Sequence, residues 1–163
     1  MNEWIIYAIG LTAQLLFSAR LLLQWIASEK NKQVITPVSF WVHSLVASFL
    51  LFTYGYLRND FPIMLGQVIT YYIYVRNLQL EGLWYRQHPV LRWFLLLFPL
   101  LTVIYFFNNN RYDLQQLFGK DNIKPGLLIW GSIGQLIFTF RFVYQWLYSE
   151  KIKRSFLPLG FWW

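Results

Sequence analysis

The chain has no cysteine, only two histidines and few charged side chains for its 163 residues. Without cysteine it can form neither a disulfide nor a thiolate metal site, and it has no thiol nucleophile. Charged residues make up 13% of the chain, whereas soluble domains carry roughly 25%. Apolar residues take their place, since 57% of the chain is hydrophobic and 21% is aromatic. This composition favours an integral membrane protein.

Catalytic patterns are missing as well. The sequence has no GxSxG motif, no P-loop and no cluster of carboxylates, and His43 is interpreted as a packing residue rather than a ligand. We therefore expect no metal site, no cofactor and no enzymatic activity of this chain alone. The net charge of +7 does not indicate a nucleic-acid partner, because the basic residues lie in short segments between apolar runs. Membrane lipids are the expected surroundings.

An internal repeat organises the sequence. Residues Gly10–Val42 and Gly131–Trp163 align without gaps at a constant offset of 121 residues. The identical pairs include Gln14/Gln135, Phe17/Phe138, Arg20/Arg141, Gln24/Gln145, Trp25/Trp146, Ser28/Ser149, Glu29/Glu150, Lys32/Lys153, Pro37/Pro158, Phe40/Phe161 and Trp41/Trp162. An apolar repeat that keeps an arginine and two glutamines inside its helix is typical of transporters built from duplicated membrane segments.

Five apolar stretches predict membrane helices of about the length that a bilayer requires. They are Trp4–Ala27, Pro37–Leu57, Phe61–Leu80, Val90–Phe107 and Gly126–Tyr148. Pro37 suits the first turn of its helix, and Asp60 is expected to cap the helix that follows it. Pro158 begins a sixth helix, of which the sequence includes only six residues. We expect the natural protein to continue beyond them or to be completed by another chain. In the second case the other chain could be a second copy, which would make the protein a homo-oligomer.

The order of the helices predicts three parts: a three-helix bundle in residues 1–82, a linker helix and outer loop in 83–124, and the start of a second bundle in 125–163. A linker helix is needed because two three-helix units joined directly would face opposite ways. Lysine and arginine are more frequent in the loops around Lys30, Arg86 and Lys151 than in the loops of the opposite side. The positive-inside rule then places these loops in the cytoplasm and the N-terminus outside.

A polar face runs along the repeated helix. At 3.6 residues per turn, these positions fall within about 120° of one another: Gln14, Phe17, Arg20, Leu21, Gln24 and Ser28, with their counterparts Gln135, Phe138, Arg141, Phe142, Gln145 and Ser149. An arginine facing lipid costs at least about 2.5 kcal/mol, so we expect this face to look inward. Two alternatives remain: Arg20 reaches the interface as a snorkelling side chain, or the glutamines only join helices by hydrogen bonds.

The third predicted helix adds Gln67, Tyr74, Arg76 and Asn77 to the polar residues. Arg76 lies at a depth similar to Arg20 and Arg141, and three arginines in one leaflet could hold a phosphate or carboxylate bidentately. The alternative is that Arg76 pairs with anionic lipid headgroups. Glu29 and Glu150 are interpreted as charges of the cytoplasmic loops.

These motifs resemble the lipid A biosynthesis N-terminal domain, a short membrane domain fused to some lipid-A-disaccharide synthases. The residues that carry the resemblance are Phe17-Ser18-Ala19-Arg20, Gln24-Trp25, Ser28-Glu29-Lys30, Pro37-Val38-Ser39-Phe40-Trp41 and Tyr74-Val75-Arg76-Asn77-Leu78. The match covers residues 9–80 well and 128–163 as a half copy. Leu21 departs from the pattern, which usually has an aromatic residue after the arginine, and Phe61 separates an Asp and a Pro that are usually adjacent.

The resemblance implies further expectations. The domain is similar to the three-helix PQ-loop units of SWEET and SemiSWEET sugar transporters, which have the same three-plus-one-plus-three layout. The family positions matched here are Gln14, Arg20, Gln24, Trp41, Gln67, Tyr74, Arg76 and Asn77, and Gln135, Arg141 and Gln145 repeat three of them. We expect a bacterial inner-membrane protein that binds or translocates a lipid-linked or phosphorylated sugar. The alternative is a non-catalytic anchor that recruits a glycosyltransferase of envelope glycolipid synthesis.

Overall fold

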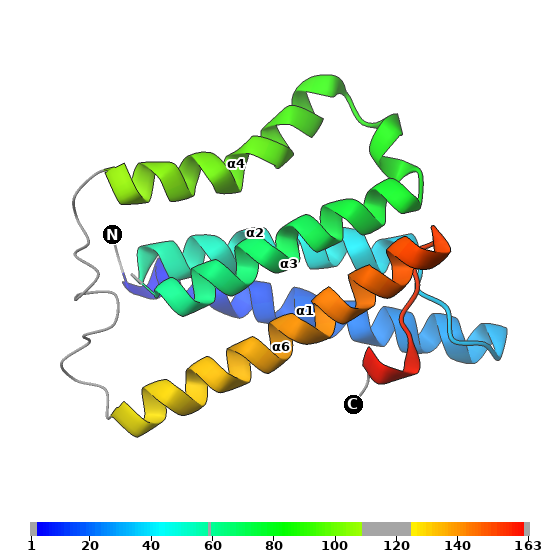
Figure 1. Cartoon of the computed structure of the whole chain (residues 1–163), viewed down its shortest axis with the longest axis horizontal. Coiled ribbons are helices and arrows are strands. Elements are labelled where there is room, and N and C mark those ends of the chain that lie inside the picture. Colours follow the sequence, from blue (N-terminus) through cyan, green and yellow to red (C-terminus); the bar gives the residue numbers. More distant parts are fainter. Residues whose placement is uncertain (1–2, 59, 109–124, 162–163) are drawn as a thin grey trace.

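A computed structural model describes residues 3–58, 60–108 and 125–161, and every regular element in these ranges is a helix (Figure 1). The predicted all-α class is confirmed. The helices are α1 (Glu3–Asn31), α2 (Val38–Leu57), α3 (Phe61–Leu80), α4 (Pro89–Asn108) and α6 (Pro125–Ile152), with 3-10 turns η1 (Leu83–Arg86) and η2 (Leu159–Phe161). Asn59, residues 109–124 of the predicted outer loop, and Trp162 lie outside the described residues.

The observed helices match the five predicted stretches closely, and α3 agrees at both ends. Asp60 caps α3 as predicted, because its side chain accepts a hydrogen bond of 3.3 Å from the backbone N–H of Ile63. The prediction for Pro37 was wrong in detail. Pro37 is the N-cap of α2 in an extended conformation, with φ −66° and ψ 152°, and helical geometry begins one residue later. After Pro158 the described chain forms only the short turn η2.

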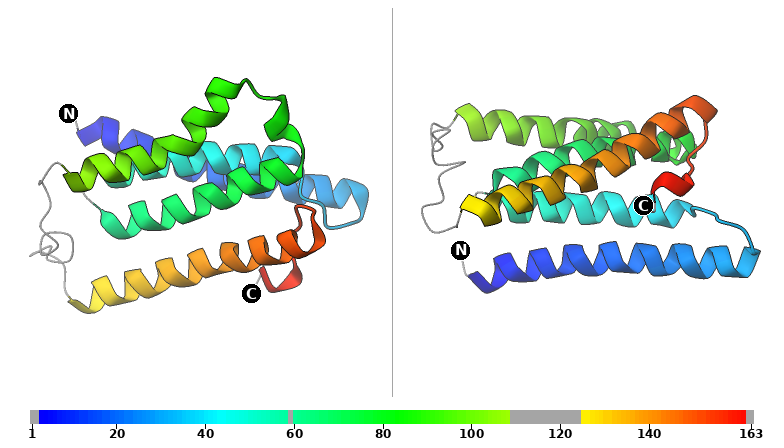
Figure 2. Two further views of the ribbon diagram at one scale, coloured as in Figure 1. Left: turned by 45° about the horizontal axis from the view of Figure 1, so that its top comes forward. Right: turned by 60° about the horizontal axis from the view of Figure 1, so that its bottom comes forward.

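Two of the described helices, α1 and α2, are long and apolar enough to cross a membrane, and α4 contains a shorter apolar stretch, Pro89–Tyr105. Helices α1, α2 and α3 pack in sequence order, so that α2 lies between the other two (Figure 1). Helix α6, far away in the sequence, packs on α3 (Figure 2). The division of the chain into two bundles and a linker remains a prediction.

Helix α4 runs beside the bundle and is joined to α3 by two tyrosines. Pro99 lies inside α4 and has no N–H, so the carbonyl of Leu95 loses its helical partner. The hydroxyl of Tyr71 donates to this carbonyl at 2.9 Å, and Tyr72 donates to the carbonyl of Leu96 at 2.8 Å. The two phenols therefore satisfy backbone groups at the proline and hold α4 against α3.

The repeat is visible in the turns that follow α1 and α6. Lys32 and Lys153 both have a positive φ, 50° and 55°, which reverses the chain at the end of each helix. One turn earlier, the Ser28 hydroxyl lies 3.2 Å from both the N–H and the carbonyl of Ile35, and Ser149 makes the same pair of contacts with Phe156 at 3.1 Å. The two copies of the repeat have therefore folded into similar helix ends.

Candidate functional site

Arg20 is turned inward and is only 3% exposed, although it lies on an apolar helix. Its Nη1 donates to the hydroxyl of Ser44 on α2 at 2.7 Å and to that of Tyr74 on α3 at 3.1 Å. Aromatic rings surround the guanidinium within cation–π distance: Phe17 at 4.6 Å, Phe40 at 4.9 Å and Phe142 at 5.3 Å. The charge is thus held at the meeting point of α1, α2, α3 and α6.

Arg141, its repeat counterpart, contacts the same aromatic group. Its guanidinium is 5.6 Å from the ring centroid of Phe142 and 4.7 Å from that of Phe161. Two arginines therefore share the ring of Phe142, whose side chain is fully buried. Neither arginine forms an ion pair with a residue that the structure describes. Because like charges in apolar surroundings repel, this pair is a favourable place for an anion.

Six buried side-chain polar atoms of the described chain have no hydrogen-bond partner. All six belong to residues that the sequence predicts as site residues: Nε of Arg20, Oε1 of Gln24, Nε1 of Trp41, Oε1 of Gln67, Nε2 of Gln135 and Nε of Arg141. An unsatisfied buried group costs roughly 1–3 kcal/mol, and native proteins keep few of them without a reason such as a bound molecule. The predicted site residues, called here the polar seam, are therefore where this chain has unused binding capacity.

Gln145 and Asn77 form the best satisfied part of the seam. Nε2 of Gln145 donates to Oδ1 of Asn77 at 3.0 Å, and Nδ2 of Asn77 donates back to Oε1 of Gln145 at 3.2 Å. Gln145 also reaches the Ser149 hydroxyl and the Phe156 carbonyl, and Ser155 donates to Asn77. Both amides are fully buried, so this reciprocal pair fixes the register of α3 against α6.

Arg76 is engaged in a different place from Arg20 and Arg141. Its Nε and Nη2 form a bidentate contact with the carboxylate of Glu150 at 3.0 and 2.8 Å, and Lys153 reaches the same carboxylate at 2.8 Å. These cations lower the pKa of Glu150 to about 2. The interpretation of Glu150 as a plain loop charge was therefore wrong, because it forms an ion pair between α6 and α3. The guanidinium of Arg76 is therefore occupied by a carboxylate of the protein itself.

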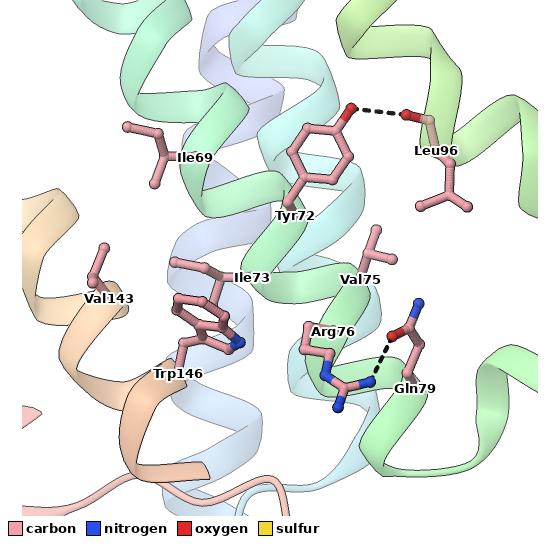
Figure 3. A pocket seen from close by; sticks show the side chains of 9 residues that line it. All are labelled: Ile69, Tyr72, Ile73, Val75, Arg76, Gln79, Leu96, Val143 and Trp146. Carbon is pink, nitrogen blue, oxygen red and sulfur yellow. Dashed lines mark hydrogen bonds between the residues drawn. The ribbon is translucent and has the colours of Figure 1, made fainter. Parts of the chain in front are cut away.

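Figure 3 shows that Arg76 lies at the end of a pocket between α3, α4 and α6, where Nη1 also donates to Gln79 at 3.0 Å. The pocket has a volume of about 420 Å³ and is otherwise apolar. Its walls include Ile69, Tyr72 and Ile73 of α3, Leu96 of α4, and Val143 and Trp146 of α6. The surroundings of Arg76 thus differ from the aromatic cluster that holds the other two arginines.

The remaining predicted residues are divided between the interior and the surface. Trp41, Gln67 and Tyr74 are buried in the core. Gln135 is partly buried and its amide lies against Gly66 of α3, where any side chain would overlap it. Gln14 is exposed and lines an outer groove beside Tyr54 of α2. The structure therefore does not place Gln14 with the arginines.

The sequence did not reveal the roles of two residues that contact the arginines. Ser44 is not among the predicted site residues, but its hydroxyl accepts a hydrogen bond from Arg20. Phe142 was noted on the polar face without a role, yet both arginines lie over its ring. The family pattern of an aromatic after the arginine was the signal that could have identified Phe142, because this residue follows Arg141 directly.

The fold and this site define an all-helical protein with a duplicated helix, in which arginine and amide side chains meet within aromatic packing. The sequence matches the Lipid A Biosynthesis N-terminal domain over residues 9–79 and 130–163, and the chain belongs to this family. It is 30% identical to the lipid-A-disaccharide synthase of Chlamydia pneumoniae, 32% to that of Chlamydia felis and 33% to that of Chlamydia abortus, in each case over 167 residues.

These alignments cover 97–98% of this chain but only 27% of each relative. The chain therefore spans about a quarter of the length of the curated relatives it matches. No solved structure matches the chain significantly. The comparisons therefore show membership of this domain family, and the relatives named above are lipid-A-disaccharide synthases.

Proposed function

We propose that this chain is a multi-pass inner-membrane protein that binds the anionic headgroup of a lipid-linked or phosphorylated sugar. In this proposal the N-terminus lies outside, and the helices belong to two PQ-loop-like bundles joined by α4. The observation that carries the proposal is the pair of arginines at Phe142. They are contributed by both copies of the repeat, and neither has a carboxylate partner among the described residues.

A phosphate suits this pair for chemical reasons. Guanidinium groups bind phosphate oxygens through two parallel hydrogen bonds, and Nε of each arginine is a buried donor without a partner. Arg141 is the more accessible of the two, so the anion would approach from α6. The unpaired side-chain atoms of Gln67, Gln135 and Trp41 supply neutral donors and an acceptor for the hydroxyl groups of a sugar.

Lipid binding by single-arginine variants tests this proposal. Purified protein in lipid nanodiscs would be mixed with an acylated sugar phosphate, or with the same glycolipid lacking its phosphate, and bound ligand measured by native mass spectrometry. Arg20→Ala and Arg141→Ala should each weaken binding of the phosphorylated form by about tenfold to a hundredfold, the range for a charged hydrogen bond. Neither change should affect the dephosphorylated form.

The matched control is Arg86→Ala, which removes an exposed arginine of η1 and should leave binding unchanged. Helical circular dichroism of each variant would show whether the fold is retained. If both seam variants are folded and bind the phosphorylated glycolipid as the parent protein does, the anion-binding proposal is wrong. Translocation would need a separate flipping assay in vesicles with the same variants.

A second candidate function rests on the names and lengths of the relatives. Each is called a lipid-A-disaccharide synthase, and this chain corresponds to 27% of its length. We propose as the alternative that the chain anchors or recruits such a glycosyltransferase at the membrane. Co-purification from detergent extracts tests this role, and Arg20→Ala should not reduce it. Repeated failure to recover a glycosyltransferase would count against anchoring without affecting the binding test above.

A further inference from the structure

The pocket of about 420 Å³ between α3, α4 and α6, called here the α3–α6 pocket, is separate from the arginine pair. Its volume is within the range of about 300–1,000 Å³ that is usual for small-molecule sites. Tyr72 spans the distance from α3 to the carbonyl of Leu96 on α4, and Trp146 of α6 forms another wall (Figure 3). The rings and hydroxyls that contact Arg20 and Arg141 are not among the residues that line this pocket.

The walls of the α3–α6 pocket suit a hydrocarbon chain better than water. Ile69, Ile73 and Val143 have only apolar side chains, and the hydroxyl of Tyr72 is already bonded to the carbonyl of Leu96. A buried water needs about two to four polar partners, which these walls do not provide. Apolar atoms in the pocket gain dispersion contacts and remove apolar surface from water. This part of the pocket therefore fits an apolar occupant.

One end of the α3–α6 pocket is cationic, because Arg76 lies there (Figure 3). Three of the five N–H groups of this arginine donate to Glu150 and Gln79, so two are not used by the described residues. Lys153 reaches the same Glu150 carboxylate at 2.8 Å, and its side chain is 70% exposed. Two cations at one carboxylate leave one positive charge in excess, at a place that solvent and lipid headgroups can reach.

Positive charge also prevails in the surrounding segments. Residues 76–86 and 150–154 contain five lysines or arginines but two glutamates. Basic pockets between helices are typical binding sites for anionic lipid headgroups. We propose that the α3–α6 pocket binds one acyl chain of an anionic glycerophospholipid, whose phosphate lies at Arg76 and Lys153. An apolar cavity with a cationic end matches an apolar chain with an anionic end. This site does not depend on anion binding at the arginine pair.

A photoreactive lipid locates the acyl chain. The protein in nanodiscs of phosphatidylcholine would receive phosphatidylglycerol with a diazirine in one acyl chain, and cross-links would be mapped by peptide mass spectrometry. We expect cross-links at Tyr72, Leu96 and Trp146, which line the pocket. Val143→Phe fills the pocket from its α6 wall and should reduce these cross-links at least about fivefold, the low end of the cost of overfilling a packed space. The matched control is Leu22→Phe, at the repeat counterpart of Val143, which is 57% exposed on α1 and should leave them unchanged.

The headgroup is tested by competition for the same cross-links. Unlabelled phosphatidylglycerol should compete about fivefold better than phosphatidylcholine, which is the effect of one basic residue near an anionic headgroup. Lys153→Gln should remove this preference, because it removes the positive charge in excess. Lys32→Gln changes the counterpart lysine, which has a similar positive φ, and should leave the preference unchanged.

Three results would overturn the proposal. They are cross-links spread evenly over the exposed helix faces, equal effects of Val143→Phe and Leu22→Phe, and equal competition by the two lipids in the parent protein. Helical circular dichroism identifies the folded variants, and if Val143→Phe is unfolded, the cross-link map and the competition experiment decide. Arg20→Ala should change none of these results, so a failure of anion binding at the arginine pair is distinguishable from a failure here.

Discussion

The amide pair of Asn77 and Gln145 allows the contact between α3 and α6 to be measured. Leucine at either position keeps a similar volume but leaves the other amide buried without its partner. Asn77→Leu removes donors and acceptors for Ile73, Gln145 and Ser155, while Gln145→Leu removes those for Asn77, Ser149 and Phe156. With a cost of about 1–3 kcal/mol for an orphaned buried group, each substitution should lower the free energy of unfolding by about 3 kcal/mol.

The double variant should lose less than the sum of its parts, because no amide remains to be orphaned. We expect it to be about 4 kcal/mol less stable than the parent, which gives a coupling free energy of about 2 kcal/mol between the two residues. Equilibrium unfolding in detergent micelles, followed by helical circular dichroism, provides the four free energies of this cycle. Gln24→Leu is the control within the same protein. Its Oε1 has no partner to lose, so its cost should stay below about 1 kcal/mol.

Additive losses would refute this reasoning. If the double variant equals the sum of the singles within about 0.5 kcal/mol, the two amides do not interact in the folded protein. The packing of α3 on α6 would then have to rest on apolar contacts alone. A Gln24→Leu variant as unstable as Gln145→Leu would also show that the two repeats have the same surroundings, contrary to the structure.

Three further predictions use differences within the chain. Gly10→Ala should destabilise the protein by about 1–3 kcal/mol in thermal unfolding, because a Cβ there would lie 2.8 Å from the ring of Tyr54. At the counterpart Gly131 an added Cβ meets nothing within 4 Å, so Gly131→Ala should be neutral or stabilising. Lowering the pH from 4.5 to about 2 should destabilise the protein in denaturant titrations, because the unfolded chain binds a proton at Glu150 that the folded ion pair resists; Glu150→Gln should lose this part of the pH dependence. Lys32→Gly should stabilise the protein by up to about 1 kcal/mol, since glycine adopts the positive φ of that turn at little cost, and Lys32→Val should do the opposite.

Local features of the fold were predictable from the sequence. Helix lengths followed from apolar runs, the cap at Asp60 from its place before an apolar stretch, and the equivalence of α1 and α6 from the constant offset of 121 residues. These features depend on neighbouring residues in the chain. The same is true of the inward-facing polar seam, because helical periodicity alone brings Arg20 and Gln24 to one face.

Partners far apart in sequence were not predictable in the same way. The periodicity of α3 shows that Arg76 and Asn77 are polar, but not that one meets Glu150 and the other Gln145 on α6. The two copies of the repeat also have different neighbours, so identical residues in the two copies have different surroundings. Arg20 has Ser44 and Tyr74 as acceptors, and Arg141 has no such hydroxyls among the described residues.

The distance in sequence between Asn77 and Gln145 affects how the chain is made. The two amides are 68 residues apart, so the ribosome completes the first roughly 3–14 seconds before the second at about 5–20 residues per second. During that interval Asn77 has been synthesised but its final partner has not. Gln24 on α1 is already present and carries the same side chain as Gln145. Synthesis of this protein therefore includes a period in which Asn77 lacks the amide with which it pairs in the folded chain.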